Sequence, residues 1–329
     1  MIVRAFRTLN PLSIIWLIIL LFVLRVGYAW HAPANISVVL LEPFARLLIP
    51  VPYEHVLSTG ADIFLAAVLV LIQALLLNYL VNHYNLLSKP TFLPALMYIT
   101  ISGLFTPFLL LSPPLICNFL VIWMLYKLFD LYKGEDAKST AYDLGMIVAI
   151  GSLIYFPFIY LFLVIWIALI IFKPFNWREW IAGVLGYATI FFFLAVFYYL
   201  NNRLGEFSNI WLPLGSKFPN KINIDYYNYL VLIPVIIILF LCFIKLRENF
   251  FRSYVQVRKS FQLLFFMFLI AGLSFYVKAE FNLNHFLLCA IPAAIFFAYY
   301  FLYATNKWVF ETLFFLLLVS IIYFQFNTF

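Results

Sequence analysis

Charged residues are scarce in this sequence. Only 10% of its 329 residues are Asp, Glu, Lys or Arg, whereas 67% are hydrophobic, and the mean hydropathy is +1.06. A soluble domain carries about 25% charged residues, because polar groups must cover its surface. The composition therefore excludes a water-soluble globular domain and indicates a chain whose solvent is lipid.

Cysteine and histidine are also rare, which limits the possible metal and redox chemistry. The three cysteines lie in apolar runs without a CxxC pair, so we expect neither a disulfide framework nor a zinc site: Cys117, Cys242 and Cys289. The four histidines are dispersed along the chain: His31, His55, His83 and His285. A membrane oxygenase or desaturase needs clustered histidines to hold iron, so that class is not expected. We expect no metal and no cofactor.

The net charge of +7 is not accompanied by a nucleic-acid motif. The sequence has no Gly-rich loop, RNA-binding aromatic box or zinc finger. Orientation in a membrane explains the excess of positive charge better, and nucleic acid is not an expected partner.

Apolar stretches long enough to cross a bilayer fill most of the chain. A spanning helix needs about 20 apolar residues. The sequence predicts an all-α integral membrane protein, with residues 1–329 forming a single polytopic domain of ten or eleven spans. The predicted spans are 11–28, 61–81, 92–111, 114–132, 142–156, 157–172, 179–200, 228–244, 261–277, 284–303 and 307–326.

Prolines predict two tight turns between these spans. A proline disfavours helix in the residue before it, so Phe156-Pro157 is expected to divide the long run from Leu144 to Phe172 into two short helices. Ser112-Pro113-Pro114 predicts a similar turn. The first span resembles a signal peptide, but bulky Tyr28 and Trp30 stand where a cleavage site needs small residues, so we expect it to remain.

The distribution of Lys and Arg predicts the orientation. Cytoplasmic loops are enriched in these residues, and an inside N-terminus places 14 of the 20 there. We therefore expect a multi-pass protein of the bacterial cytoplasmic membrane with a cytoplasmic N-terminus and a periplasmic C-terminus. The segment from Lys245 to Lys259 is part of this basic set and is expected to contact anionic lipid.

Two predicted outer loops, about residues 29–60 and 201–227, are long. Long loops in compact proteins are usually functional or disordered, and the first is too hydrophobic for disorder. Its apolar residues recur at helical spacing from Leu40 to Leu48, while Glu42 and Arg46 share the other face. We expect a short helix lying flat on the outer membrane surface.

The span interiors hold few groups that could carry ions. Gln73, Asn78 and Asn118 are their most polar side chains. Ionisable residues within spans usually mark ion or proton pathways, so an ion-coupled transporter is not expected. Any reactive site should then lie at an interface.

Polar residues gather at the predicted outer interface. They include Arg25, His31, Glu42, Arg46, Glu54, His55, Asp62, Arg203, Glu206, Lys278, Glu280 and His285. One interpretation is a site with a carboxylate general base and cations that hold a phosphate leaving group. The alternative is ordinary loop polarity, with Glu42 and Arg46 forming an i, i+4 pair worth a few tenths of a kcal/mol, and with Lys278 and His285 snorkelling or capping.

Several stretches resemble the GT-C superfamily of polytopic glycosyltransferases, which use polyprenyl-phosphate sugars. They are Leu109-Leu-Leu-Ser-Pro-Pro-Leu115, Leu144-Gly-Met-Ile-Val-Ala-Ile-Gly-Ser-Leu153 and His285-Phe-Leu-Leu-Cys-Ala-Ile-Pro292. The order of one span, a large outer loop with flat helices and then paired short spans is also similar. The resemblance implies a GT-C-like arrangement and sugar transfer at the periplasmic face. The chain also looks like an uncharacterised family of bacterial inner-membrane proteins.

The resemblance implies roles for individual residues. Glu42 would be the catalytic base, and the polyprenyl phosphate would be bound by Arg46, Lys278, His285, Arg25 and His31. The chain departs from the superfamily in its acids, because Glu42, Glu54 and Asp62 are separated instead of paired.

The sequence leaves three functions open. The leading hypothesis is a GT-C-like transferase with a lipid-linked donor as partner. The alternative is a non-catalytic subunit or scaffold of a cell-envelope complex with a membrane-protein partner. The third is a transporter or flippase of a lipid-linked substrate, which would need a hydrophilic cavity that the apolar spans argue against.

Overall fold

The computed structural model describes residues 2–31, 58–133, 136–207, 210–211, 228–249, 253–277 and 282–326. Within this part of the chain all regular structure is helical and no strand occurs. The prediction of an all-α protein is confirmed at this level.

Eight helices of the described part are long and apolar enough to cross a membrane. Three of them are extended by a short 3-10 segment: η4 (Asn228–Val231) leads into α10, η6 (Ser274–Val277) follows α11 and η7 (Leu283–Cys289) leads into α12. The chain is therefore a multi-pass membrane protein. The long helices are α2 (Leu12–His31), α3 (Thr59–His83), α5 (Pro113–Lys133), α8 (Trp177–Leu200), α10 (Leu232–Asn249), α11 (Val255–Leu273), α12 (Ala290–Tyr303) and α13 (Lys307–Phe326).

The remaining predicted spans correspond to shorter helices. They are α4 (Leu93–Ile101) with η1 (Thr106–Leu109), α6 (Ala137–Ile154), and η2 (Phe156–Leu161) with α7 (Phe162–Phe172). The short helices α1 (Ile2–Phe6) and α9 (Leu204–Phe207) complete the described elements.

The predicted span over residues 92–111 is not a continuous helix. The α4 helix ends at Ile101, where the Ser102 hydroxyl donates to the carbonyl of Ile99 (2.9 Å), and the chain turns before η1. Pro107 lacks the amide proton that a continuing helix would use. The α4 helix is therefore only nine residues long.

Both predicted proline turns are confirmed. The α6 helix ends at Ile154, and Tyr155 is extended (φ −143°, ψ 107°) immediately before Phe156-Pro157. The α5 helix begins at Pro113, a position that needs no amide donor.

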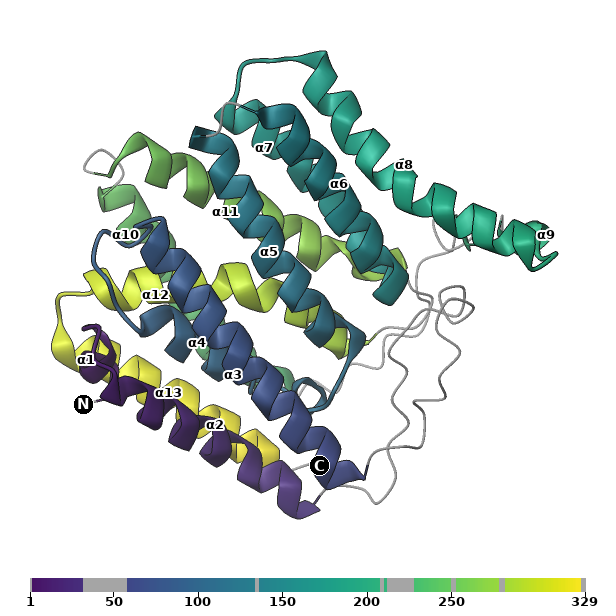
Figure 1. The fold of residues 1–329 in the computed structure, drawn as a ribbon. Helices are drawn as coiled ribbons and strands as arrows, with labels where there is room; N and C mark the ends of the chain where they lie inside the picture. The colour runs from purple at the N-terminus through teal and green to yellow at the C-terminus, as the bar shows by residue number, and fades with distance from the viewer. Residues whose placement is uncertain are drawn as a thin grey trace.

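The α12 helix lies at the centre of the bundle and is buried almost along its whole length, from Ala290 to Phe301. It packs against α4 and α10, and η7 packs against α5 and α11. The α2 and α13 helices lie side by side at one edge, and α8 lies along α6 at the other (Figure 1).

The α6 and α8 helices pack through glycine. A Cβ atom on Gly145 would clash with the carbonyl of Gly183, and one on Gly186 would clash with the carbonyl of Tyr142. Small residues let two membrane helices approach backbone to backbone. This close contact holds α8 to the bundle, although most of its surface is exposed.

Basic residues mark one end of the bundle, which we call the basic end. In the described part of the chain, Arg25 and Arg203 are the basic residues that lie elsewhere. The residues of the basic end are Arg4, Arg7, Lys89, Lys127, Lys133, Lys138, Lys173, Arg178, Lys245, Arg247, Arg258, Lys259 and Lys307. The α1 helix lies at this end and α13 runs away from it (Figure 1). We call the other end the opposite end.

Arg7, which directly follows α1, links the N-terminal helix to α12 and α13 at the basic end. Its guanidinium donates to the carbonyls of Phe301 and Ala304, each at 2.9 Å, and lies over the ring of Phe310. The carboxylate of Glu311 accepts from the amide of Arg4 at 3.2 Å. These contacts join the first and last described helices.

Candidate anion-binding site inside the bundle

A cluster of polar side chains crosses the interior between α3, α4 and α5. The Tyr98 hydroxyl donates to Oε1 of Gln73 (2.6 Å) and accepts from Nδ2 of Asn118 (3.0 Å). Gln73 donates to the carbonyl of Leu115 (2.6 Å), and Asn118 donates to that of Leu287 on η7 (3.1 Å). Gln73, Tyr98 and Asn118 are fully buried. The network therefore fixes the relative positions of α3, α4, α5 and η7.

Arg25 enters this region from α2 without a partner. It is only 3% exposed, and within the described part of the chain none of its three guanidinium nitrogens has a hydrogen-bond partner. Tyr98 is near enough to interact with it electrostatically. Arg25 lies six residues before the last residue of α2, which is about 9 Å along the helix axis. A buried cation thus sits in the half of the membrane nearer the opposite end.

Asp62 is a buried carboxylate at the same end of the bundle. It lies in the first turn of α3 and is 1% exposed. Its Oδ2 accepts from the amide of Leu111 (3.2 Å), whereas Oδ1 has no partner. Tyr28, one turn after Arg25 on α2, interacts with it electrostatically. An acidic and a basic group therefore both lie beneath the end of α2.

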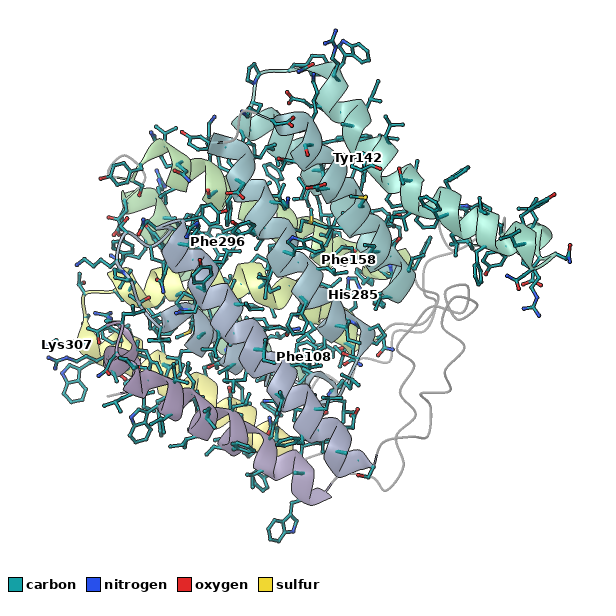
Figure 2. The ribbon with its side chains drawn as sticks, in the orientation of Figure 1. Phe108, Tyr142, Phe158, His285, Phe296 and Lys307 are labelled. Carbon is teal, nitrogen blue, oxygen red and sulfur yellow. The ribbon has the colours of Figure 1, made fainter. Side chains whose placement is uncertain are left out.

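His285 occupies a separate, fully bonded position on η7. Its Nδ1 lies 2.9 Å from the Tyr155 hydroxyl, and its Nε2 lies 2.7 Å from the carbonyl of Ala271. A carbonyl can only accept, so Nε2 carries the proton and Nδ1 accepts from Tyr155. The ring is 2% exposed and lies inside the bundle, far from Lys307 at the basic end (Figure 2).

The sequence-predicted site residues are only partly brought together by the described part of the structure. Arg25 joins the polar cluster, and Asn118 links that cluster to η7, the segment that carries His285. Both ring nitrogens of His285 are used within the chain, so it is placed to fix η7 in position. Glu42, Arg46 and Lys278, with the expected flat helix, lie outside the described residues, as does the side chain of His31.

From the sequence, Gln73 and Asn118 are polar residues of the spans without a predicted role, and Tyr98 is not predicted to be part of a site. Tyrosine is abundant in this chain, with 22 copies, so no pattern distinguished Tyr98. The usable signal was the position of Gln73 and Asn118 in otherwise apolar spans, since buried polar groups need partners.

An apolar groove of about 420 Å³ lies next to the cluster. It starts one turn beyond Tyr98 on α4 and continues along η7 and α12. Its walls include Ile101, Leu104, Phe105, Phe286, Cys289 and Ala290. In a membrane protein such a groove suits a hydrocarbon chain.

A metal centre has no counterpart in the described part of the chain. No group of three or more His, Cys, Asp or Glu side chains there could hold a metal ion.

Comparison with known proteins identifies a family without an assigned activity. No curated protein and no solved structure matches the chain. A family model does match it over residues 34–329, which is most of its length. The chain therefore belongs to the family described as "Family of unknown function (DUF6427)".

Proposed function

We propose that this protein binds a lipid-linked phosphate at the opposite end of the bundle and transfers a sugar from it. The observation that carries the proposal is Arg25, a buried guanidinium without a partner. A charged side chain inside a span is costly, and ionisable residues there usually serve a function. A phosphate would provide the missing partner, because guanidinium matches phosphate oxygens in a bidentate geometry.

The surroundings of Arg25 suit a lipid with an anionic head. Tyr98 lies near the cation, and its hydroxyl is held in place by Gln73 and Asn118. The groove of about 420 Å³ supplies an apolar channel for the chain of the lipid. The end of α2, about 9 Å from Arg25, is at the depth from which a headgroup would enter.

The proposed reaction is sugar transfer from a polyprenyl-phosphate donor. The acceptor hydroxyl attacks the anomeric carbon, the bond from that carbon to the phosphate oxygen breaks, and polyprenyl phosphate leaves. Glu42 takes the proton of the acceptor hydroxyl. Arg25, with Arg46 and Lys278, stabilises the charge that grows on the leaving phosphate. His285 positions η7 and does not contact the phosphate.

Lipid binding is tested by native mass spectrometry of the detergent-solubilised full chain with added polyprenyl phosphate. Arg25→Gln is expected to abolish the bound-lipid peak, because it removes the buried cation. The matched control is Arg203→Gln, which removes an exposed arginine at the end of α8 and is expected to bind as the unmodified protein does. Equal binding by Arg25→Gln and the unmodified protein would refute the site.

Sugar transfer is tested separately in membranes that contain the Glu42→Gln variant. We expect loss of transfer with polyprenyl-phosphate binding retained, since Glu42 acts on the acceptor. Unchanged transfer would reject Glu42 as the base. A stable co-purifying protein, with lipid binding unaffected by Arg25→Gln, would favour the scaffold over the transferase.

A further inference from the structure

A second groove, of about 460 Å³, lies at the basic end of the bundle, between α10 and α11. It differs in position from the site around Arg25, which lies toward the opposite end. The α7 and α12 helices close its inner side through Ile171, Phe296 and Tyr299.

The helical repeat of α11 gives the groove its two margins. Val257, Phe261 and Phe265 recur every four residues along one line, and Arg258, Gln262 and Phe266 along the next. Residues four apart lie on the same face of a helix. Each line begins near the basic end and runs about 12 Å along the helix toward the opposite end.

Polarity changes along this descent. Ser253, Arg258 and Gln262 lie nearer the basic end, and Phe265 and Phe266 lie farther along the helix from it. A lipid has the same order, with a polar head at the membrane surface and hydrocarbon below it. The groove thus matches a lipid lying along α11.

The charge around the mouth is positive. Lys245 is paired with Glu248 at 2.6 Å at this end of α10. Arg247 and Arg258 add positive charge, and the ammonium of Lys259 lies 5.8 Å from the ring centre of Tyr132. Glu248 is the acid of the described α10 and α11 helices. The mouth therefore favours an anionic head over a zwitterionic one.

We infer that this groove is a binding site for one anionic phospholipid of the leaflet at the basic end. The phosphate contacts Arg258, with Gln262 as a further hydrogen-bond donor, and an acyl chain lies between α10 and α11 against the phenylalanines. Such a lipid would fasten α10, which is otherwise largely exposed, to the centre of the bundle.

The experiment uses the full chain reconstituted in nanodiscs of either phosphatidylglycerol or phosphatidylcholine, followed by native mass spectrometry of the released complex. We expect the unmodified protein to retain one phosphatidylglycerol and no phosphatidylcholine at this site. Arg258→Gln is expected to weaken that binding at least tenfold, and Arg258→Lys to preserve it. The matched control Lys138→Gln, an exposed lysine of the same end on α6, should bind as the unmodified protein does.

A second readout covers the case of a poorly folded variant. Added phosphatidylglycerol should raise the unfolding temperature of the unmodified protein and of Arg258→Lys, but not of Arg258→Gln. Equal retention of phosphatidylglycerol by Arg258→Gln, or equal retention of both lipids by the unmodified protein, would overturn the inference. Polyprenyl-phosphate binding through Arg25 is measured independently, so failure of one site leaves the other intact.

Discussion

Arg25 is the residue on which the functional account depends. Most buried charges in proteins are paired, because removing an ion from water costs several kcal/mol that only a partner can offset. Arg25 is buried to 3% exposure, and no described residue gives its guanidinium such a partner. A bound phosphate would offset the free energy that burying the Arg25 charge costs.

A consequence is that Arg25 should destabilise the lipid-free protein. Replacing Arg25 by Met, which keeps much of the length but removes the charge, is expected to raise the free energy of unfolding by about 1–4 kcal/mol in delipidated protein. Thermal unfolding in detergent measures the change. A lower unfolding temperature for Arg25→Met would show that the guanidinium stabilises the fold by itself.

The Tyr98 hydroxyl holds the interior polar network together. Tyr98→Phe leaves Oε1 of Gln73 buried without a donor, so we expect a loss of about 1–3 kcal/mol in stability. The control is Tyr142→Phe, which removes a hydroxyl bonded to Thr189 at 3.0 Å in a more accessible position. If both variants lost equal stability, the network would have no special role.

At the scale of elements, hydropathy predicted where the helices lie. Proline predicted the end of α6 and the start of α5. Eight of the eleven predicted spans correspond to described helices long and apolar enough to cross a membrane, and the other three correspond to shorter helical segments. The break after Ile101 could not be predicted in this way: residues 102–111 are apolar overall, and the turn depends on Ser102 and Pro107 within tertiary contacts. The site was predicted less well, since Arg25 was placed at an interface whereas the structure buries it against Tyr98.

The close contact of α6 and α8 gives a prediction for these two elements. Gly186→Leu should separate the helices, because the side chain would occupy the space of the Tyr142 backbone. We expect a fall in thermal stability. We also expect a loss of disulfide cross-linking between a pair of cysteines introduced one into each helix. Gly60→Ala is the control, since nothing lies within 4 Å of a Cβ atom there. Undiminished cross-linking in Gly186→Leu would contradict the described packing.

At the scale of the whole molecule, the basic end predicts how the bundle is oriented in the membrane. Lys and Arg accumulate on the cytoplasmic side of membrane proteins, so the basic end should face the cytoplasm. The α1 helix lies there, whereas α13 runs to the opposite end (Figure 1). In that orientation the Arg25 site would lie on the outer side and the Arg258 groove on the inner side.

Reporter fusions test that orientation directly. Alkaline phosphatase fused after the C-terminus should be active, because it folds outside the cytoplasm, and a fluorescent protein at the same position should be dark. The N-terminal fusions should give the reverse result. A fluorescent C-terminal fusion would place the C-terminus inside and would contradict this orientation.

The central claim is that a lipid-linked phosphate completes the site of Arg25. The measurement that tests it most directly is an electron cryo-microscopy map of the full chain extracted with its native lipids. The account predicts phosphate density within hydrogen-bonding distance of the Arg25 guanidinium, with chain density in the groove beside Leu104 and Phe286. A map in which a carboxylate of the protein itself pairs with Arg25 and side chains fill the groove would contradict it.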